Sequence, residues 1–495
     1  MKKIIVVILS VLLLVLLISS FTSCNNSNGD RNNFEPFDSS GNNASNSSGN
    51  QSTENNTNQS DENSNTRPAS QGLSYQKGSN GITITGIGSC KDREVVIPKK
   101  IEGSYVVRIA QNAFKETDIV SITIPETITS VGEDAFYDCY ELKKVYIENL
   151  SKWCEISFEI IGHVTYSNPM SCGADLYLNG NIVRELIIPD GIKTVKPYTF
   201  YGCKSIVKLI IPDSVETIST GAFSECTNLV SIEFGTSVRD IFVSGDGMSA
   251  IWAGEKAFHG CHPVEIINHS SLPISDHYRY EDIVEYAKLV HEGESKVLIE
   301  DDFVFFSYRN VTYLVKYLGD EYSLILPDDY KGNSYGIAAG ALYNDNIVSL
   351  TIPQSITTIE NASISSQYLV EIVNNSSATI TGTNAKEIHS GDSRLINYND
   401  YLLYTTDNDI VYLVKHIGDK TSIILDREIE DREYKIDYLF LVSIKNCTVY
   451  YTGTFDEWNK MYYQELENIY YYSESEPTDL KNYWHYVNGA PTIWE

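Results

Sequence analysis

The chain repeats one line of sequence, and this repeat constrains the fold more than any other feature. The clearest copy runs from Ser121 to Cys139 and reads SITIPETITSVGEDAFYDC. It returns from Glu185 to Cys203 and again from Lys208 to Cys226, so the last two copies begin 23 residues apart. Units of this size cannot bury an apolar face alone, and they stack on their neighbours in an elongated array. The sequence therefore predicts a solenoid.

Each unit carries the same residue types in the same places. Apolar residues alternate before a proline, as in Ile122, Ile124 and Pro125, and a later aromatic residue and cysteine close the unit. Alternation indicates a strand, and the strand should end at the proline because proline has no N–H for a central ladder. Parallel strands of successive coils are then expected to form one long sheet. The outward positions are expected at Thr123, Ile187, Lys208, Ile210 and Thr351.

These residues resemble the BspA-type leucine-rich repeat, with its pattern I-x-I-P-x-x-V-x-x-I-x-x-x-A-F-x-x-C. The resemblance covers most of residues 81–495. It implies a β-rich leucine-rich repeat solenoid with one long parallel sheet, short turns and helices, and a disordered N-terminal tether. It also implies a surface-exposed protein that binds protein partners, most often in adhesion.

The first 24 residues resemble a bacterial lipoprotein signal peptide. Two lysines precede an unbroken apolar run from Ile4 to Leu17, and small residues lead to Cys24, the predicted lipidated residue. An uncleaved membrane anchor is the alternative. Either interpretation exports the rest of the chain, so we expect an extracytoplasmic, lipid-anchored protein at the cell surface.

Residues 25–72 are half Asn and Ser, and they contain almost no large apolar side chains. Such a segment cannot bury enough surface to offset its ordering entropy, so it is expected to be a disordered linker with a mean reach of roughly 40 Å. The net charge of the whole chain is −29. This charge argues against nucleic acid as a partner.

The remaining chain is expected to hold three parts. Residues 73–275 form a first solenoid segment, and residues 276–442 form a second one with β-hairpin insertions. The hairpin sequence at 301–327 recurs at 399–426, so a larger module is itself duplicated. Residues 443–495 form an aromatic-rich C-terminal cap.

The aromatic tail also offers a second function. Capping the exposed last coil is one role for its rings. A sugar-stacking surface with Trp458, Trp484 and Tyr486 is the other, which would make the chain a carbohydrate-binding surface lipoprotein with glycan partners. A third alternative is a structural envelope protein whose repeats self-associate.

The sequence contains nine cysteines. Four of them occupy one repeat position and are predicted to form an inward ladder of free, buried thiols, in preference to a bridge between neighbours. These are Cys139, Cys203, Cys226 and Cys261. The pattern His259–His262 has two imidazoles and a thiol, but zinc usually needs a wider spacing and a fourth ligand.

No catalytic motif is present in the sequence. A serine elbow, an H-E-x-x-H zinc motif, a phosphate loop and a dinucleotide fingerprint are all missing. We therefore assign no catalytic residue, no metal and no cofactor, and we do not expect an enzyme.

Overall fold

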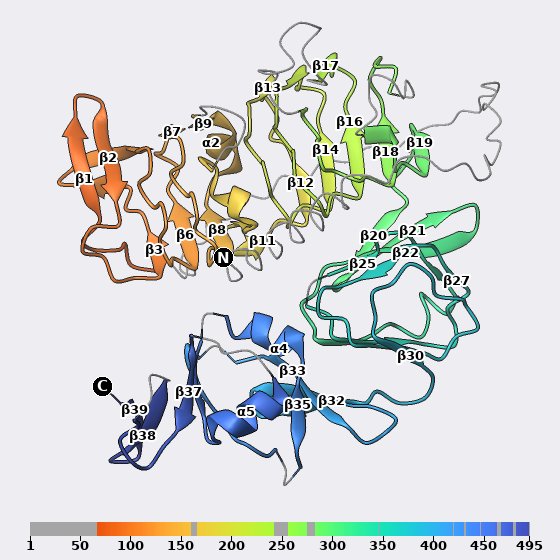
Figure 1. The fold of residues 1–495 in the computed structure, drawn as a ribbon. Coiled ribbons are helices and arrows are strands. Elements are labelled where there is room, and N and C mark those ends of the chain that lie inside the picture. The colour runs from red at the N-terminus through yellow and green to blue at the C-terminus, as the bar shows by residue number, and fades with distance from the viewer. Residues whose placement is uncertain are drawn as a thin grey trace, which may run out of the picture. The chain divides into compact units, whose positions relative to one another are not determined.

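The computed structural model (Figure 1) describes residues 67–494, apart from 160–165, 242–255, 275–282, 345, 419, 430–431, 446, 463–466 and 479–481. The chain divides into two units, Met1–Asn65 and Thr66–Glu495. All described residues belong to the second unit. The predicted signal peptide, Cys24 and the predicted linker up to residue 66 lie outside the described residues.

An antiparallel hairpin, β1 (Ser74–Gly78) and β2 (Gly81–Gly86), opens the array. The first parallel ladder follows, and it ends at the short antiparallel strand β11 (Asn181–Ile182). Its strands are β3 (Glu94–Val96), β6 (Ser121–Ile124), β8 (Lys144–Ile147) and β10 (Asp175–Leu178). A second sheet continues from β2 through β5 (Ser104–Ile109), β7 (Ser130–Val131) and β9 (Ser157–Phe158), with β4 (Lys100–Ile101) beside β5.

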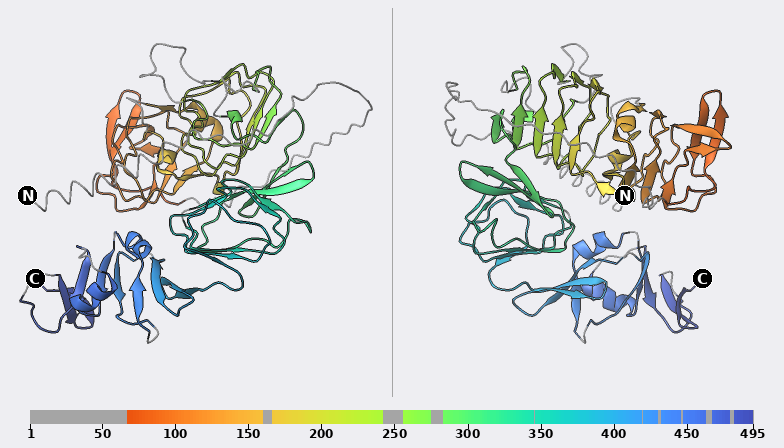
Figure 2. Two further views of the ribbon diagram at one scale, coloured as in Figure 1. Left: turned by 45° about the vertical axis from the view of Figure 1, so that its right-hand side comes forward. Right: turned by 180° about the vertical axis from the view of Figure 1, so that it is seen from behind.

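The second parallel ladder lies next along the chain, and Figures 1 and 2 show its strands side by side. Its strands are β12 (Glu185–Ile187), β14 (Lys208–Ile211), β16 (Ser231–Phe234), β18 (Glu265–Asn268) and β19 (Leu289–His291). The same coils form a narrow sheet of β13 (Thr194–Val195), β15 (Thr217–Ile218) and β17 (Asp240–Ile241). Strands β6 and β14 end directly before Pro125 and Pro212, so the prediction that proline ends the strand is confirmed.

Identical positions of successive coils pack on one another in the core. The rings of Phe114 and Phe136 stack at 5.5 Å, and those of Phe200, Phe223 and Phe258 stack at 5.4 and 5.3 Å. All five rings are buried in one hydrophobic cluster that runs from Leu73 to Val284. This one-coil spacing lets each unit bury its neighbour's apolar face, as a repeat of this length requires.

The long insertion after β8 is a modified coil. It contains helix α2 (Leu150–Glu155) and the 3-10 helix η1 (Pro169–Cys172), capped at their N-termini by Asn149 and Asn168. Strand β10 then rejoins β8 in parallel register. The buried Trp153 donates its indole N–H to the carbonyl of Thr199, 3.0 Å away, which ties this coil to the next.

The next segment begins with an antiparallel sheet and returns to a parallel ladder. The antiparallel strands are β20 (Val297–Glu300), β21 (Phe303–Tyr308) and β22 (Val311–Tyr317). The ladder strands are β23 (Ser323–Ile325), β26 (Ser349–Ile352), β29 (Glu371–Asn374) and β30 (Glu387–His389). Short strands complete the coils, namely β24 (Gly336–Ile337), β25 (Leu342–Tyr343), β27 (Thr358–Ile359) and β28 (Ile364–Ser365).

The last segment repeats this plan. Its antiparallel strands are β31 (Leu395–Tyr398), β32 (Tyr401–Thr405) and β33 (Val411–His416), and β35 (Tyr434–Ile436) pairs with β33. Its ladder is β34 (Ser422–Leu425), β36 (Thr448–Tyr451), β37 (Ile469–Tyr472) and β38 (Tyr483–Val487), closed by antiparallel β39 (Ala490–Ile493). Helices α4 (Tyr438–Ser443) and α5 (Phe455–Met461) complete its coils. The expected boundary between residues 442 and 443 falls inside one ladder and one hydrophobic cluster.

The parallel strands do not form the single long sheet that the sequence predicted. They fall into separate ladders, because an antiparallel strand or an antiparallel three-stranded sheet interrupts the stacking at each break. The interruption after β19 and the one after β30 are antiparallel sheets of the same strand order with similar sequences, so the predicted duplication is present in the fold.

Each of these two junctions is built around a buried glutamate. Glu265 accepts hydrogen bonds from the hydroxyls of Ser231 and Ser295, at 2.6 and 2.7 Å, and from the N–H of Lys296 at 2.6 Å. His291 lies 3.2 Å from the same carboxylate. The side chain is fully buried, so its oxygens are satisfied by protein groups rather than by water.

Glu371 has the same surroundings at the second junction. Its carboxylate accepts hydrogen bonds from the hydroxyls of Ser349 and Ser393 and from the backbone N–H of Arg394. The imidazole of His389 is its fourth partner. The two clusters correspond residue by residue. Each of them fixes the turn that leads from a ladder into the next hairpin.

Candidate binding surfaces

The first ladder exposes one row of side chains between its buried positions. In-register pairing places Val96, Thr123, Tyr146 and Tyr177 side by side on four successive strands, and we call them the first outward row. All four are partly exposed, whereas their neighbours Ile122 and Val145 are fully buried. The rings of Tyr146 and Tyr177 lie 5.0 Å apart.

The second ladder carries a matching row of Ile187, Ile210 and Glu233, which we call the second outward row. Ile187 is 52% exposed although it is aliphatic and lies on a regular strand. Beside this row, the ammonium group of Lys208 lies 3.4 Å from the carboxylate of Glu185. The outward placement predicted for Thr123, Ile187, Lys208 and Ile210 agrees with this register, and Thr351 occupies the same position on β26.

The last segment contains a groove between its hairpin and its ladder, with a volume of about 670 Å³. Its lining includes the aromatic residues Tyr398, Tyr401 and Tyr450 and several apolar residues, among them Ile424. We call it the tyrosine groove. This volume lies within the range of small-molecule sites, about 300–1,000 Å³.

The charged groups of the tyrosine groove are mostly acidic. Asp400, Asp426 and Glu428 line it, and its ammonium group, that of Lys420, lies 3.0 Å from the carboxylate of Asp400. Burial raises the pKa of Tyr401 to about 12, so its hydroxyl remains protonated and donates to the carbonyl of Ile424 at 3.0 Å.

The tryptophans proposed for sugar stacking lie elsewhere. Trp458 and Trp484 are both 0% exposed, so neither ring offers a face to a ligand. Trp458 packs against Tyr451 in the core, and Trp484 donates its indole N–H to the carbonyl of Tyr451 at 2.8 Å. Tyr486 is 48% exposed and keeps an accessible ring.

Tyr450, which the sequence reasoning did not single out, is a partly exposed aromatic residue of the terminal ladder that lines the tyrosine groove. Its signal was the alternation of strand β36, in which the flanking Val449 and Tyr451 are buried and Tyr450 points the other way.

The four cysteines predicted to point inward are all buried. Cys139, Cys226 and Cys261 donate to the carbonyl of the phenylalanine one coil earlier, at 3.0–3.2 Å. Cys172 makes the same bond to Phe136. The sequence reasoning missed this fifth member because the insertion hid its register. Burial raises the pKa of the Cys203 thiol to about 11.

The residues of His259–His262 do not converge. The Cys261 thiol points into the core, His259 lies 3.9 Å from Glu225, and the ring of His262 packs edge-on to Tyr286. In the part of the chain that the structure describes, no group of three His, Cys, Asp or Glu side chains is placed to hold a metal ion.

The buried glutamate clusters do not form a catalytic triad. The serine hydroxyls donate to the carboxylate and not to the imidazole, so the serine–histidine hydrogen bond of a triad is missing from both clusters. Full burial of both carboxylates also keeps them from any substrate.

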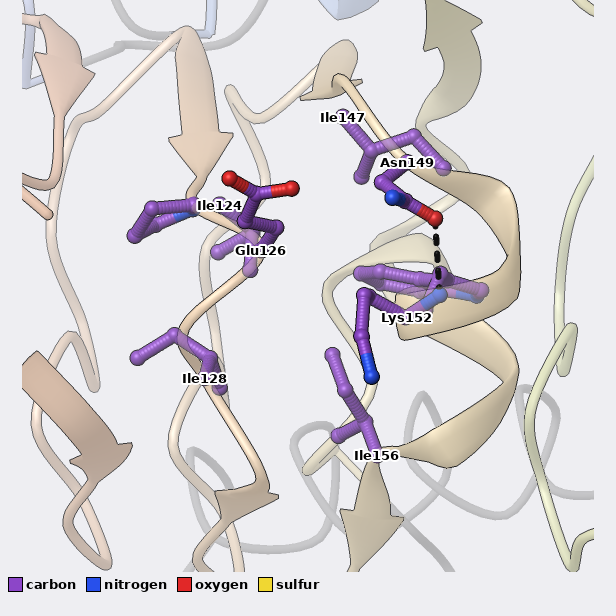
Figure 3. A pocket seen from close by; sticks show the side chains of 9 residues that line it. Ile124, Glu126, Ile128, Ile147, Asn149, Lys152 and Ile156 are labelled. Carbon is purple, nitrogen blue, oxygen red and sulfur yellow. Dashed lines mark hydrogen bonds between the residues drawn. The ribbon is translucent and has the colours of Figure 1, made fainter.

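A second depression lies beside helix α2 (Figure 3). Ile124 and Ile128 form one wall, and Ile147 and Ile156 the other. The side chain of Asn149, which accepts a hydrogen bond from the N–H of Lys152, stands at its edge. Its free volume of about 10 Å³ holds about one water molecule, so it is not a ligand site.

The fold defines a β-solenoid assembled from leucine-rich repeats. A family model, the BspA-type leucine-rich repeat region, matches six copies over residues 89–168, 170–244 and 331–388. These three stretches of the chain therefore carry BspA-type leucine-rich repeats. The family model describes a structural repeat and not a family of enzymes. The comparison with curated proteins finds no match.

Several solved structures are similar to this chain. A leucine-rich repeat protein of T. pallidum is 22% identical over 45% of this chain and 82% of its own, with a TM-score of 0.23. A leucine-rich cell surface protein of Faecalibacterium prausnitzii is 15% identical over 81% of this chain and 99% of its own, with a TM-score of 0.23. A leucine-rich repeat protein of Bacteroides ovatus is 15% identical over 81% and 89%, with a TM-score of 0.25.

Among the described residues, no helix is both long and apolar enough to cross a membrane.

Proposed function

We propose that this chain is a lipid-anchored cell-surface protein that binds protein partners through its outward rows, in adhesion. The observation that carries the proposal is the exposure of apolar and tyrosine side chains at regular spacing on rigid parallel strands. A strand ladder holds such side chains at fixed positions, so little entropy is lost when a partner binds. Tyrosine is among the residues that contribute most to protein interfaces.

The anchor part of the proposal rests on the sequence before the linker. The apolar run and Cys24 support lipid attachment, and the Asn/Ser-rich linker would hold the repeats away from the membrane. Metabolic labelling with a clickable fatty acid tests this step. Label should appear on the wild-type chain and be lost in Cys24→Ala, and label retained in that variant would contradict the lipid anchor.

The binding part is tested with a fragment of residues 67–495 on an array of extracellular matrix proteins. The fragment begins at residue 67 because Ser70 is buried and its N–H bonds to the carbonyl of Val96. Saturable binding to a protein on the array supports the proposal. A fragment that binds none of them, and that instead gains mass with rising concentration, would favour the self-associating envelope protein.

A glycan ligand is the second candidate function. The tyrosine groove favours it, because it combines accessible aromatic rings with hydrogen-bonding side chains. This candidate places the sugar site at Tyr450 rather than at the buried Trp458 and Trp484.

A further inference from the structure

The tyrosine groove differs in chemistry from the outward rows. Its aromatic faces come from Tyr398, Tyr401 and Tyr450, and it adds three carboxylates to its apolar lining, whereas the outward rows carry mainly apolar and tyrosine side chains. Carboxylates and a serine hydroxyl line the same groove as the rings. A ligand that fits it must offer both C–H faces and many hydroxyl groups.

The charges of the groove exclude anionic ligands. Three carboxylates face it, and its ammonium group is already paired with one of them. A phosphate, a sulfate or a uronic acid would therefore be repelled. A neutral sugar has no charge to repel, and its hydroxyl groups can donate to carboxylate oxygens in charge-assisted hydrogen bonds.

The ring of Tyr450 packs against neighbouring aromatic rings. Tyr450 packs against Trp484 at 5.5 Å and against Tyr470 at 6.0 Å. Trp484 is fixed by its own hydrogen bond to the backbone of β36, and Tyr401 is fixed by its bond to Ile424. Rings that are ordered before binding lose little entropy when a ligand stacks on them.

We propose that the tyrosine groove binds a neutral oligosaccharide, with a sugar ring stacked on Tyr450 and its hydroxyls bonded to Asp426 and Glu428. The site lies on the last segment, apart in sequence from both outward rows. It deepens the glycan candidate by naming the ligand chemistry and the residues. It does not require the protein-binding function, so either can fail without the other.

Isothermal titration of the full-length chain in detergent tests the proposal. The probes are neutral hexasaccharides of glucose, mannose, galactose and N-acetylglucosamine, and hexagalacturonate is the charged control. At least one neutral probe should bind, and the charged control should not. Failure of all four neutral probes to bind, or binding of hexagalacturonate at equal strength, would overturn the proposal.

Variants locate the site. Tyr450→Ala should weaken the binding about tenfold or more, whereas Tyr450→Phe should retain it because the ring face remains. Asp426→Ala combined with Glu428→Ala provides a second route that leaves the packed rings in place, and a similar loss is expected. Tyr146→Ala, on the first outward row, is the matched control and should leave the affinity for the sugar unchanged. Unchanged affinity in both groove variants would place the sugar elsewhere and refute the assignment.

Discussion

Replacing the buried glutamate of the second junction tests how the segments are joined. In Glu371→Ala, two serine hydroxyls, one backbone N–H and one imidazole lose their common acceptor, and the lost carboxylate and the Ser349 hydroxyl are fully buried. Leaving a buried hydrogen-bonding group unpaired costs about 1–3 kcal/mol, and breaking a buried charged cluster by removing one member costs about 3–5 kcal/mol. We expect a loss of about 3–5 kcal/mol in the stability of this junction.

The assay is hydrogen exchange of the amides in β29, β30 and β31, because a chain of several segments need not unfold in one step. Their protection should fall while that of β3 and β6 stays unchanged. Glu126→Ala is the control: it removes an exposed carboxylate paired with Lys99 and should lower stability by less than about 0.5 kcal/mol. A loss below about 1 kcal/mol in Glu371→Ala would refute the reasoning that the carboxylate holds the turn.

The same glutamate should make the junction sensitive to acid. Burial raises the pKa of Glu371, but the hydrogen bonds from Ser349, Ser393, His389 and the Arg394 N–H outweigh burial and leave the pKa below its ordinary value of 4.5. A carboxyl group whose pKa is lowered in the folded state contributes stability above its unfolded pKa and loses it as the pH falls through the folded value. Protection of β29 should therefore fall below about pH 4.5, and Glu371→Gln should remove this dependence.

Three further predictions follow from the core. Iodoacetamide should leave Cys203 and Cys226 of the native chain unmodified and should label both after denaturation, because both are fully buried; equal labelling in the two states would contradict the inward ladder. Burial lowers the pKa of Lys316 to about 8, so Lys316→Met should raise stability in urea by about 1–2 kcal/mol at pH 7. This gain should shrink as the pH rises from 8 towards 10.5, and a gain that does not depend on pH would show that the charge is not its cause. Phe223→Ala leaves a gap in the ring stack and should lower the free energy of unfolding by about 3–5 kcal/mol. Tyr140→Ala, at an exposed position, should lower it by less than about 0.5 kcal/mol. Equal midpoints of thermal unfolding for the two variants would contradict the stacked core.

The sequence predicted what depends on residues within one coil. The alternation of Ile122 and Ile124, with Pro125 after them, was enough to place a strand and its end, and the 23-residue spacing placed the next one. Repetition made these inferences secure, because the same residues occupy the same position in several coils.

The sequence did not predict what depends on residues far apart. Glu265 and Glu371 occupy the same position in two similar stretches of sequence, VEIINHSS and VEIVNNSS. Hydrogen bonds to them, however, come from Ser295 and Ser393, which lie 30 and 22 residues further on. The tyrosine groove joins Tyr398 to Tyr450 across two strands of different sheets. A tryptophan side chain has one polar atom, so it can lie at a solvent-exposed surface or in a core. Trp484 is buried because Tyr472 and Tyr486 pack against it, and this packing cannot be read from the sequence.

The binding role of the outward rows is the central claim, and one measurement tests it most directly. The affinity of fragment 67–495 for the matrix protein found on the array is measured by surface plasmon resonance for the wild type and for Ile187→Asp combined with Ile210→Asp. Charged groups at the centre of an interface should weaken binding about thirtyfold or more. Ile325→Asp, at an isoleucine that is also exposed but lies on another ladder, should leave the affinity unchanged. Equal affinity of the double variant and the wild type would contradict the claim.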